Sequence, residues 1–108
     1  DLSLSFYCAV ENGIVLTVMT PGPMLPNLQH LFEGLQERLG ELLLTIGCDC
    51  FLRRLELEDG GNLEQIGGFL RDQRVMGFNT YGEQFNGMHI NQTFTGVAIA
   101  RDRSPGRR

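Results

Sequence analysis

The chain has 108 residues, of which 42% are hydrophobic and 20% charged, a balance that predicts one compact domain with a single core. Its apolar runs are far shorter than the roughly 18 residues of a membrane-spanning helix, so we expect no membrane segment. All nine basic residues are arginines, which excludes chemistry that depends on a P-loop lysine or a Schiff-base lysine.

Charge is distributed unevenly along the chain. Residues 1–100 carry five arginines against twelve acidic residues, a net charge of −7, whereas residues 101–108 carry four arginines against one aspartate, a net charge of +3. An acidic body repels a phosphate backbone, so we expect no nucleic-acid partner. The sequence therefore divides into a domain at 1–100 and a basic tail or linker at 101–108.

Three cysteines, Cys8, Cys48 and Cys50, make an odd number in a chain large enough to fold without disulfides. Together with the lack of a secretory leader, they predict reduced thiols and a cytoplasmic location. Cys48 and Cys50 are too closely spaced for a C-x-x-C motif and no second ligand pair follows, so we expect no structural zinc. The chain begins without methionine, and we interpret it as part of a longer protein.

The first predicted element is a β-hairpin. Polar and apolar residues alternate through 2–6, an apolar run continues to Val10, and 13–20 is rich in β-branched residues. Asn12-Gly13 favours the positive φ of a tight turn, and a Pro-Gly-Pro sequence ends the second strand.

An amphipathic helix and a central strand follow. Apolar residues recur with i, i+3, i+4 spacing from Leu28 to Leu39, which predicts a helix of about fourteen residues with one buried stripe. Pro26 suits its first turn, and Gly40 suits its C-terminal cap. The continuous apolar run at 42–46 is typical of a central strand that is covered on both faces.

The segment 51–58 (FLRRLELE) fits either a short helix or an alternating strand; the helix is favoured, with Asp49 as its candidate cap. Asn62 followed by Gln65 resembles a capping box that opens a further helix. After that helix the pattern predicts a strand at 75–81, a polar connection at 82–91 and a final strand at 93–100.

These elements run in the order β-β-α-β-α-β-β. The strands at 42–46 and 75–81 are joined by a helical crossover, so they should be parallel and the crossover right-handed. The sequence therefore predicts an α+β fold with a mixed five-stranded sheet and helices mainly on one face.

Polar residues gather at two places, 47–54 (GCDCFLRR) and 77–93. Loops beyond strand ends commonly bind ligands, because free backbone donors and polar side chains meet there. Glu83 and His89 could form an acid–base pair, but no nucleophile with a base partner is recognisable. We therefore expect a binding protein and not an enzyme.

Near the C-terminus, GFNTYGEQFNGMHINQTFTGVAIA contains a TYGE segment followed by an HxNQT segment and a last strand. This combination resembles the C-terminal signature of the FIST C-domain family. LSFYCAVENGIVLTV and IGCDCFLRRLELE are similar to the family's opening hairpin and its strand-plus-Cys/Arg segment. Many members have a Cys-x-Gly-Arg type segment where this chain reads CDCFLRR, so the role of Arg53 and Arg54 does not carry over directly.

The resemblance implies a sensory domain of bacterial intracellular signal transduction that binds a small molecule, with amino acids proposed. It implies two further partners, an N-terminal FIST domain and a signalling output domain or kinase. A zwitterion would suit a site with Arg53 or Arg54 for its carboxylate and Glu83 for its amine. The candidate ligand-binding residues that the resemblance marks are Cys50, Arg53, Tyr81, Gly82, Glu83, His89, Asn91, Gln92 and Thr93.

Two alternatives stay open. Some proteins of the wider family are described as haem-containing nitric oxide sensors, and such a role would make His89 an axial ligand. The chain has no haem-attachment motif and His89 has polar neighbours, so we expect no haem and no other cofactor. The second alternative is an interaction module whose polar loop contacts a protein partner.

Overall fold

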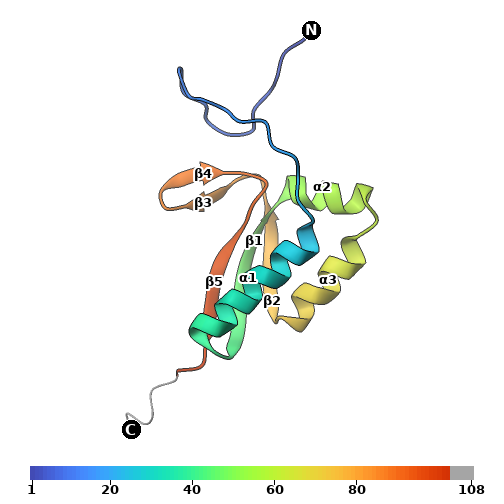
Figure 1. Ribbon diagram of the computed structural model, residues 1–108, viewed down its shortest axis with the longest axis vertical. Helices are drawn as coiled ribbons and strands as arrows, with labels where there is room; N and C mark the ends of the chain where they lie inside the picture. Colours follow the sequence, from blue (N-terminus) through green and yellow to red (C-terminus); the bar gives the residue numbers. More distant parts are fainter. Residues whose placement is uncertain (103–108) are drawn as a thin grey trace.

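The computed structural model describes residues 1–102, which form three helices, a three-stranded sheet and a two-stranded sheet (Figure 1). No helix in this range is both long and apolar enough to cross a membrane. The α+β class and the helix at 51–58 are confirmed. The elements are α1 (Met24–Leu39), β1 (Leu42–Cys50), α2 (Phe51–Asp59), α3 (Leu63–Asp72), β2 (Val75–Thr80), β3 (Glu83–Phe85), β4 (Met88–Ile90) and β5 (Phe94–Ala100).

The larger sheet has the strand order β2-β1-β5 and is mixed. β1 pairs with β2 in parallel, with Cys48 opposite Phe78, and with β5 in the antiparallel sense, with Cys48 opposite Thr95. The parallel pairing of the two strands that flank the α2–α3 crossover agrees with the prediction from the sequence.

The sequence marks both ends of helix α1, with a proline in its first turn and a glycine directly after its last residue. Pro26 lies in its first turn, where a missing N–H costs nothing. Gly40 ends it with φ 88°, a conformation that favours glycine, and donates its backbone N–H to the Gln36 carbonyl at 2.8 Å. The predicted Gly40 cap is confirmed.

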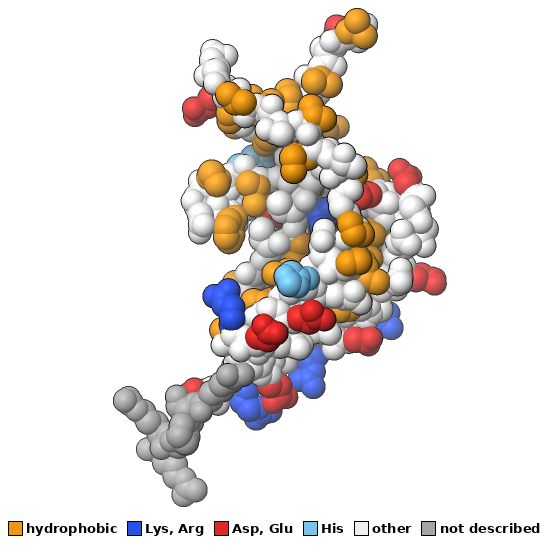
Figure 2. All heavy atoms as spheres, viewed as in Figure 1, with side chains coloured by type: hydrophobic (Ala, Val, Ile, Leu, Met, Phe, Trp, Pro, Cys, Tyr) orange, Lys and Arg blue, Asp and Glu red, His pale blue; other side chains and the backbone are white. Residues whose placement is uncertain are grey.

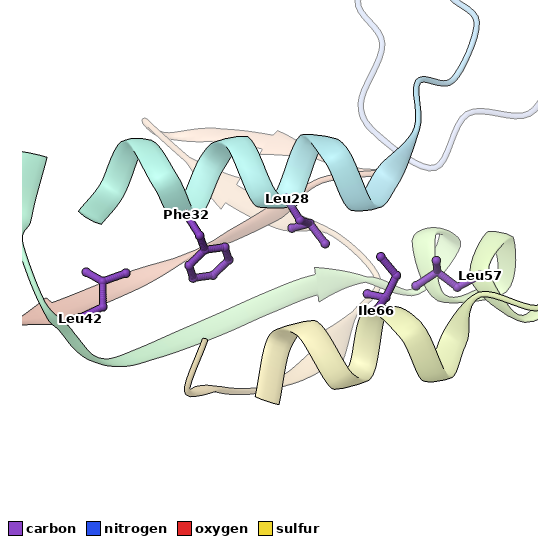
Figure 3. Packing of buried hydrophobic residues seen from close by; sticks show 5 residues of the cluster. All are labelled: Leu28, Phe32, Leu42, Leu57 and Ile66. Carbon is purple, nitrogen blue, oxygen red and sulfur yellow. The ribbon is translucent and has the colours of Figure 1, made fainter. Parts of the chain in front are cut away.

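The core lies between one face of this sheet and the helices (Figure 3). The Phe32 ring of α1 packs edge-on against Phe69 of α3 at 5.8 Å between centroids and against Phe94 of β5 at 6.4 Å. Because α1 and α3 touch each other and the same sheet, they lie on one face, as predicted. The buried cluster consists of Leu28, Phe32, Leu42, Leu57 and Ile66.

A row of glycines crosses the sheet beneath this core. Gly47 of β1 is in register with Gly77 of β2 and Gly96 of β5. A Cβ atom on Gly47 would lie 2.7 Å from the ring of Phe94. Glycine at this position therefore lets the Phe94 ring lie flat against the sheet.

The opposite face of the sheet is apolar and uncovered within residues 1–102. Ile46 is 43% exposed, Phe78 65% and Val97 64%. The prediction that the central strand is covered on both faces is therefore wrong: only the α1–α3 face has a packed layer. The large apolar residues exposed on these three strands are Leu43, Ile46, Met76, Phe78, Val97 and Ile99.

The prediction of two strands in an N-terminal hairpin is also wrong. Residues 1–23 contain neither helix nor strand, and most of their side chains are exposed. Only the predicted turn is present, with Gly13 at φ 85° and the Ile14 N–H donating to the Glu11 carbonyl at 3.4 Å. An isolated hairpin is marginal in water, so without a third strand its pairing is not maintained. The five-stranded sheet is thus a three-stranded sheet plus a separate hairpin.

That separate hairpin forms within residues 82–91, which were predicted to be a polar connection. β3 and β4 pair in the antiparallel sense across Asn86 and Gly87, which adopt φ 50° and 77°. Two successive residues with positive φ are characteristic of a tight hairpin turn. Asn86-Gly87 therefore forms a hairpin turn inside residues predicted only as a polar connection.

Two predicted caps are not present. The N-cap of α2 is Cys50 and not Asp49, and Asn62 caps α3 without any side-chain hydrogen bond, so the capping box with Gln65 is wrong. The basic tail predicted at 101–108 lies outside the described residues beyond Asp102. Within the described part, Arg101 donates from Nε to Glu41 at 2.8 Å.

Candidate functional site

One end of the larger sheet collects most of the polar side chains predicted to bind a ligand. β1 and β2 finish there, β5 begins there, and the β3–β4 hairpin folds beside it (Figure 1). The backbone N–H of Cys50 donates to the Thr93 carbonyl at 3.0 Å, which ties the end of β1 to the start of β5. Residues from 49–54 and 79–93 therefore meet at a single place.

Glu83 is the buried centre of this group, with only 2% of its surface exposed. The Thr93 hydroxyl donates to its Oε2 at 2.6 Å, and the Thr80 hydroxyl donates to its Oε1. A buried carboxylate without hydrogen bonds would be strongly destabilising, and these two hydroxyls supply them. Glu83 thus joins the end of β2 to the start of β5.

Asp49 and Arg53 form a second, less deeply buried pair. Arg53 Nε donates to Asp49 Oδ1 at 2.6 Å, and the two side chains are 15% and 16% exposed respectively. The spacing of four residues across the β1–α2 junction places them together. Burial raises the pKa of Asp49 above its usual range, the Arg53 charge opposes this rise, and the nearby Glu83 charge adds to it.

Polar side chains of β2 and α2 extend this group. Asn79 Nδ2 and the Thr80 hydroxyl both reach the Asp49 carbonyl, at 3.4 and 3.5 Å. Arg54 donates to Asn79 Oδ1 at 3.3 Å and to Glu58 at 2.8 Å, and it is about half exposed. We call the set Asp49, Arg53, Asn79, Thr80, Glu83, Asn91 and Thr93 the polar cluster.

Two donors of the polar cluster have no partner. Among the described residues, Arg53 Nη2 and Asn91 Nδ2 are buried atoms that make no hydrogen bond. Asn91 directly follows Ile90, which pairs with Glu83, and the Glu83 charge acts on Asp49, which holds Arg53. Each donor thus lies beside a carboxylate residue of the polar cluster or its strand partner, and a buried unpaired N–H costs about 1–3 kcal/mol unless something accepts from it.

His89 is not a member of the polar cluster. It lies opposite Gln84 in the β3–β4 hairpin, and a Cβ atom on Gly82 would collide with its Nε2. Glycine at 82 is therefore required for the imidazole to lie against the backbone. No hydrogen bond joins Glu83 to His89 within the described residues, so the predicted acid–base pair is not formed.

The surroundings of His89 do not fit a haem. An axial ligand needs open space in front of its ring nitrogen, and Nε2 faces Gly82 instead. The neighbouring apolar pocket, of about 260 Å³, is on the α2 side and is lined by other residues. Within residues 1–102, no three His, Cys, Asp or Glu side chains are grouped to hold a metal ion.

That apolar pocket contains two further predicted residues. Cys50, only 1% exposed, and Tyr81 line it, and the Tyr81 ring lies 5.4 Å from that of Phe51. Its complete lining is Tyr7, Cys50, Phe51, Leu52, Leu55 and Tyr81. Tyr81 and Cys50 thus adjoin the polar cluster, and only the Cys50 backbone, through its hydrogen bond to the Thr93 carbonyl, is bonded to it.

The structure therefore brings Arg53, Glu83, Asn91 and Thr93 together. Gln92 is exposed, with φ 52°, in the turn between β4 and β5. Sequence reasoning missed Asn79 and Thr80 as members of the cluster and assigned Asp49 only a capping role. No local pattern predicts the Asp49–Arg53 ion pair, because Asp49 lies in β1 and the i, i+4 rule holds only within a helix.

The fold and the site together define the class of this protein. It is an α+β domain with a mixed sheet, one helical layer and a polar cluster beyond the strand ends. A family model, the FIST C domain, matches residues 1–86. The chain belongs to this family, which is a signal-transduction domain of sensory type. No curated protein and no solved structure matches the chain.

Proposed function

We propose that this chain is a non-enzymatic sensory domain of a bacterial cytoplasmic receptor, and that it binds an amino acid or a similar zwitterion at the polar cluster. The observation that carries the proposal is the pair of buried, unpartnered donors, Arg53 Nη2 and Asn91 Nδ2. A ligand carboxylate would accept from both and remove the cost of leaving them unpaired. In a receptor, an N-terminal FIST domain and an output domain or kinase would pass on the binding signal.

The carboxylate end of the ligand is assigned to Arg53. Its Nε donates to Asp49 at 2.6 Å, which fixes the guanidinium plane, while the buried Nη2 has no acceptor. Charge-assisted N–H···O bonds of this type are about twice as strong as neutral ones. Arg54 is less suitable, because it is half exposed and already bound to Glu58.

The amine end is better matched to Asp49 than to Glu83. Asp49 retains some exposure, whereas Glu83 is 2% exposed and each of its oxygens already accepts from a threonine. Glu83 then supports the site indirectly, because it holds the hydroxyls of Thr80 and Thr93 in place. This assignment differs from the sequence prediction, which gave the amine to Glu83.

The bare apolar face of the sheet favours a second candidate, an interaction module that meets its partner through this face and not, as the sequence suggested, through the polar loop. Contiguous exposed apolar residues on one face are typical of a surface that another protein covers. In that case a protein partner would meet the face formed by Ile46, Phe78 and Val97. This function and ligand binding at the strand ends use different surfaces and are separable by mutation.

The test is ligand-induced stabilisation of the full-length protein, screened against the twenty amino acids by thermal unfolding. At a hundredfold excess over Kd, a bound amino acid should stabilise the fold by about 2.7 kcal/mol. Arg53→Gln should abolish this shift, whereas the matched control Arg54→Gln should retain it. If no amino acid shifts the unfolding, or if Arg53→Gln responds like wild type, the assignment is wrong.

An absorption spectrum of the same preparation tests the haem alternative. The packing of His89 on Gly82 leads us to expect no Soret band, with or without added haemin. A band that forms on reconstitution and disappears in His89→Ala would contradict this.

A further inference from the structure

The apolar pocket beside α2 is a second candidate binding site, apart from the polar cluster. It has a volume of about 260 Å³, and within residues 1–102 none of its lining residues carries a charge. Four of the six lining residues, Tyr7, Phe51, Leu52 and Leu55, belong neither to the polar cluster nor to the residues marked by the sequence. The amino-acid site proposed above therefore makes no use of most of this pocket.

The helical repeat of α2 places the pocket and Arg53 on different sides of this helix. Phe51 and Leu52 are four and three residues before Leu55, so all three share one stripe. Arg53 and Leu57 are also four residues apart and lie on the opposite stripe, where Leu57 is buried in the core. The pocket side of α2 thus faces away from the core and from the Arg53 side chain.

Aromatic rings form half of the pocket lining. The Phe51 ring lies 5.4 Å from the Tyr81 ring at an interplanar angle of 45°, and Tyr7 of the N-terminal segment lines the same pocket. Tyr7 is 72% exposed and Tyr81 84%, so both rings have surface left to bury. A further ring bound here would make the offset or edge-on contacts that aromatic pairs favour.

The size of the pocket limits its occupant. An apolar cavity of about 150 Å³ is large enough for benzene, whereas drug-sized ligands take about 300–1,000 Å³. The pocket volume of about 260 Å³ lies between these values and suits one substituted ring.

Charge excludes most ionic ligands. A charge that is buried without a partner is strongly unfavourable, and no side chain of the lining would pair with one. Figure 2 shows the visible arginine side chains mainly over the lower half of the molecule, away from the end where the N-terminal segment lies. A carboxylate or phosphate would therefore have no matched donor in the pocket.

We propose that this pocket is a second ligand site, which binds a small uncharged aromatic molecule with a single ring, such as a phenol. The ring packs between Tyr7 and the Phe51–Tyr81 pair. It then contacts three parts of the chain, namely the N-terminal segment, the start of α2 and the residue after β2. Because residues 1–23 form neither helix nor strand, the bound ring adds contacts between this segment and the body of the domain. Occupancy of the pocket is thus a second input to a domain of sensory type.

The test is a titration of the full chain with phenol, followed by NMR of the backbone amides. Saturable shifts are expected at residues 50–55 and 81, with a Kd of about 1 mM or tighter. Leu55→Trp fills the pocket and should weaken binding at least about tenfold. Leu31→Trp is the matched control: Leu31 lies in α1, is 42% exposed against 39% for Leu55, and does not line the pocket.

Tyr7→Ala is the second variant, and it removes one ring from a segment without helix or strand, so the fold should be unaffected. The loss of one aromatic contact should weaken phenol binding about two- to tenfold. If Leu55→Trp does not fold, this variant decides. The proposal is overturned if wild type shows no saturable shift, or if every pocket variant that folds binds phenol like wild type.

Three further probes test the chemical class. Cyclohexanol has a similar size without an aromatic ring, benzoate adds a negative charge, and tetramethylammonium is a compact cation. Phenol should bind at least about tenfold more tightly than each of them. Equal binding of cyclohexanol or benzoate would contradict the proposal. Tighter binding of tetramethylammonium would also contradict it, because the rings would then form a cage for quaternary ammonium ions.

Arg53→Gln separates this site from the amino-acid site. Since Arg53 is on the other side of α2, this variant should bind phenol like wild type even where its response to amino acids is lost. A parallel loss of phenol binding would show that the pocket belongs to the amino-acid site, and the proposal of a second site would be wrong. If no amino acid binds but phenol does, only the function proposed above fails.

Discussion

Two buried regions of this domain are built on opposite principles. Beneath α1 and α3, Phe32, Leu28 and Ile66 exclude water and contain no polar atom. Beyond the strand ends, the polar cluster buries Glu83 together with the Asp49–Arg53 pair. Both regions connect several elements, but only the apolar one gains free energy from burial itself.

The difference between the two regions supports the roles that we propose for them. An apolar cluster of the same volume at the strand ends would stabilise the fold at least as well, since buried ion pairs seldom exceed well-packed hydrophobic residues in net stability. The polar cluster also leaves Arg53 Nη2 and Asn91 Nδ2 unpaired, a cost that no folding argument explains. This composition agrees with the ligand-binding role that we propose for the polar cluster.

The largest loss of stability on mutation is expected in the apolar region. Phe32→Ala removes a ring that is 1% exposed and contacts both Phe69 and Phe94. We expect the free energy of unfolding to fall by about 3–5 kcal/mol, from lost burial plus the cavity left behind. Urea unfolding followed by circular dichroism measures it. A loss below about 1 kcal/mol would show that the helical layer does not depend on this ring.

A smaller effect is expected in the polar cluster. Glu83→Ala deletes the acceptor for two hydroxyls, Thr80 and Thr93, and should lower the free energy of unfolding by about 2–3 kcal/mol. Glu83→Gln keeps the shape and one acceptor oxygen, so its cost should be about 1 kcal/mol. The same urea unfolding experiment applies to both variants.

The role of Glu83 then follows from the ligand response of the Gln variant. In the proposed site Glu83 supports Thr80 and Thr93 and does not contact the ligand, so Glu83→Gln should keep most of the amino-acid-induced stabilisation. If the Gln variant is as stable as wild type but loses all response to ligand, Glu83 contacts the ligand directly and the support role is wrong.

Whether an element of this fold could be predicted from the sequence depends on whether its pattern is local or requires a partner element elsewhere in the chain. The spacing from Leu28 to Leu39 and the glycine at 40 specify α1 by themselves, and both predictions are confirmed. The two Asn-Gly turns have equal local signals, yet strands formed only beside 86–87, where Glu83 anchors the hairpin to β2 and β5. At 12–13 no such anchor exists, so the same signal predicted strands that are unpaired.

The candidate site shows the same limit. The TYGE and HxNQT segments identified Glu83, Asn91 and Thr93 as residues of interest, and the structure brings them together. Which of them would face a ligand could not be predicted, because it depends on which atoms the hydroxyls of Thr80 and Thr93 already occupy. The packing of His89 on Gly82 likewise depends on β3–β4 pairing, which the sequence did not predict.

The smallest expected effect distinguishes the two regions by pH. The apolar cluster has no titrating group, whereas burial raises the pKa of Asp49 above its ordinary value of 3.8, against the opposing charge of Arg53. An acid whose pKa is raised on folding favours the folded state most when protonated. Its contribution is therefore fully present below pH 3.8 and is lost as the pH rises through the higher pKa of the folded state.

Asp49→Asn mimics the protonated carboxyl at every pH, so it isolates this contribution. The difference in free energy of unfolding between the Asn variant and wild type should favour the variant most at pH 7. It should shrink as the pH falls through the raised pKa, and be close to zero below 3.8, where both side chains are neutral. Urea titrations at several pH values give the difference directly, and Phe32→Ala provides a control whose difference in free energy of unfolding from wild type should not change over this range.

If the Asp49→Asn variant is instead less stable than wild type at pH 7 and recovers on acidification, the ion pair with Arg53 outweighs the cost of desolvating Asp49. Asp49 would then be held ionised by its arginine, and the polar cluster would stabilise the fold by charge pairing after all.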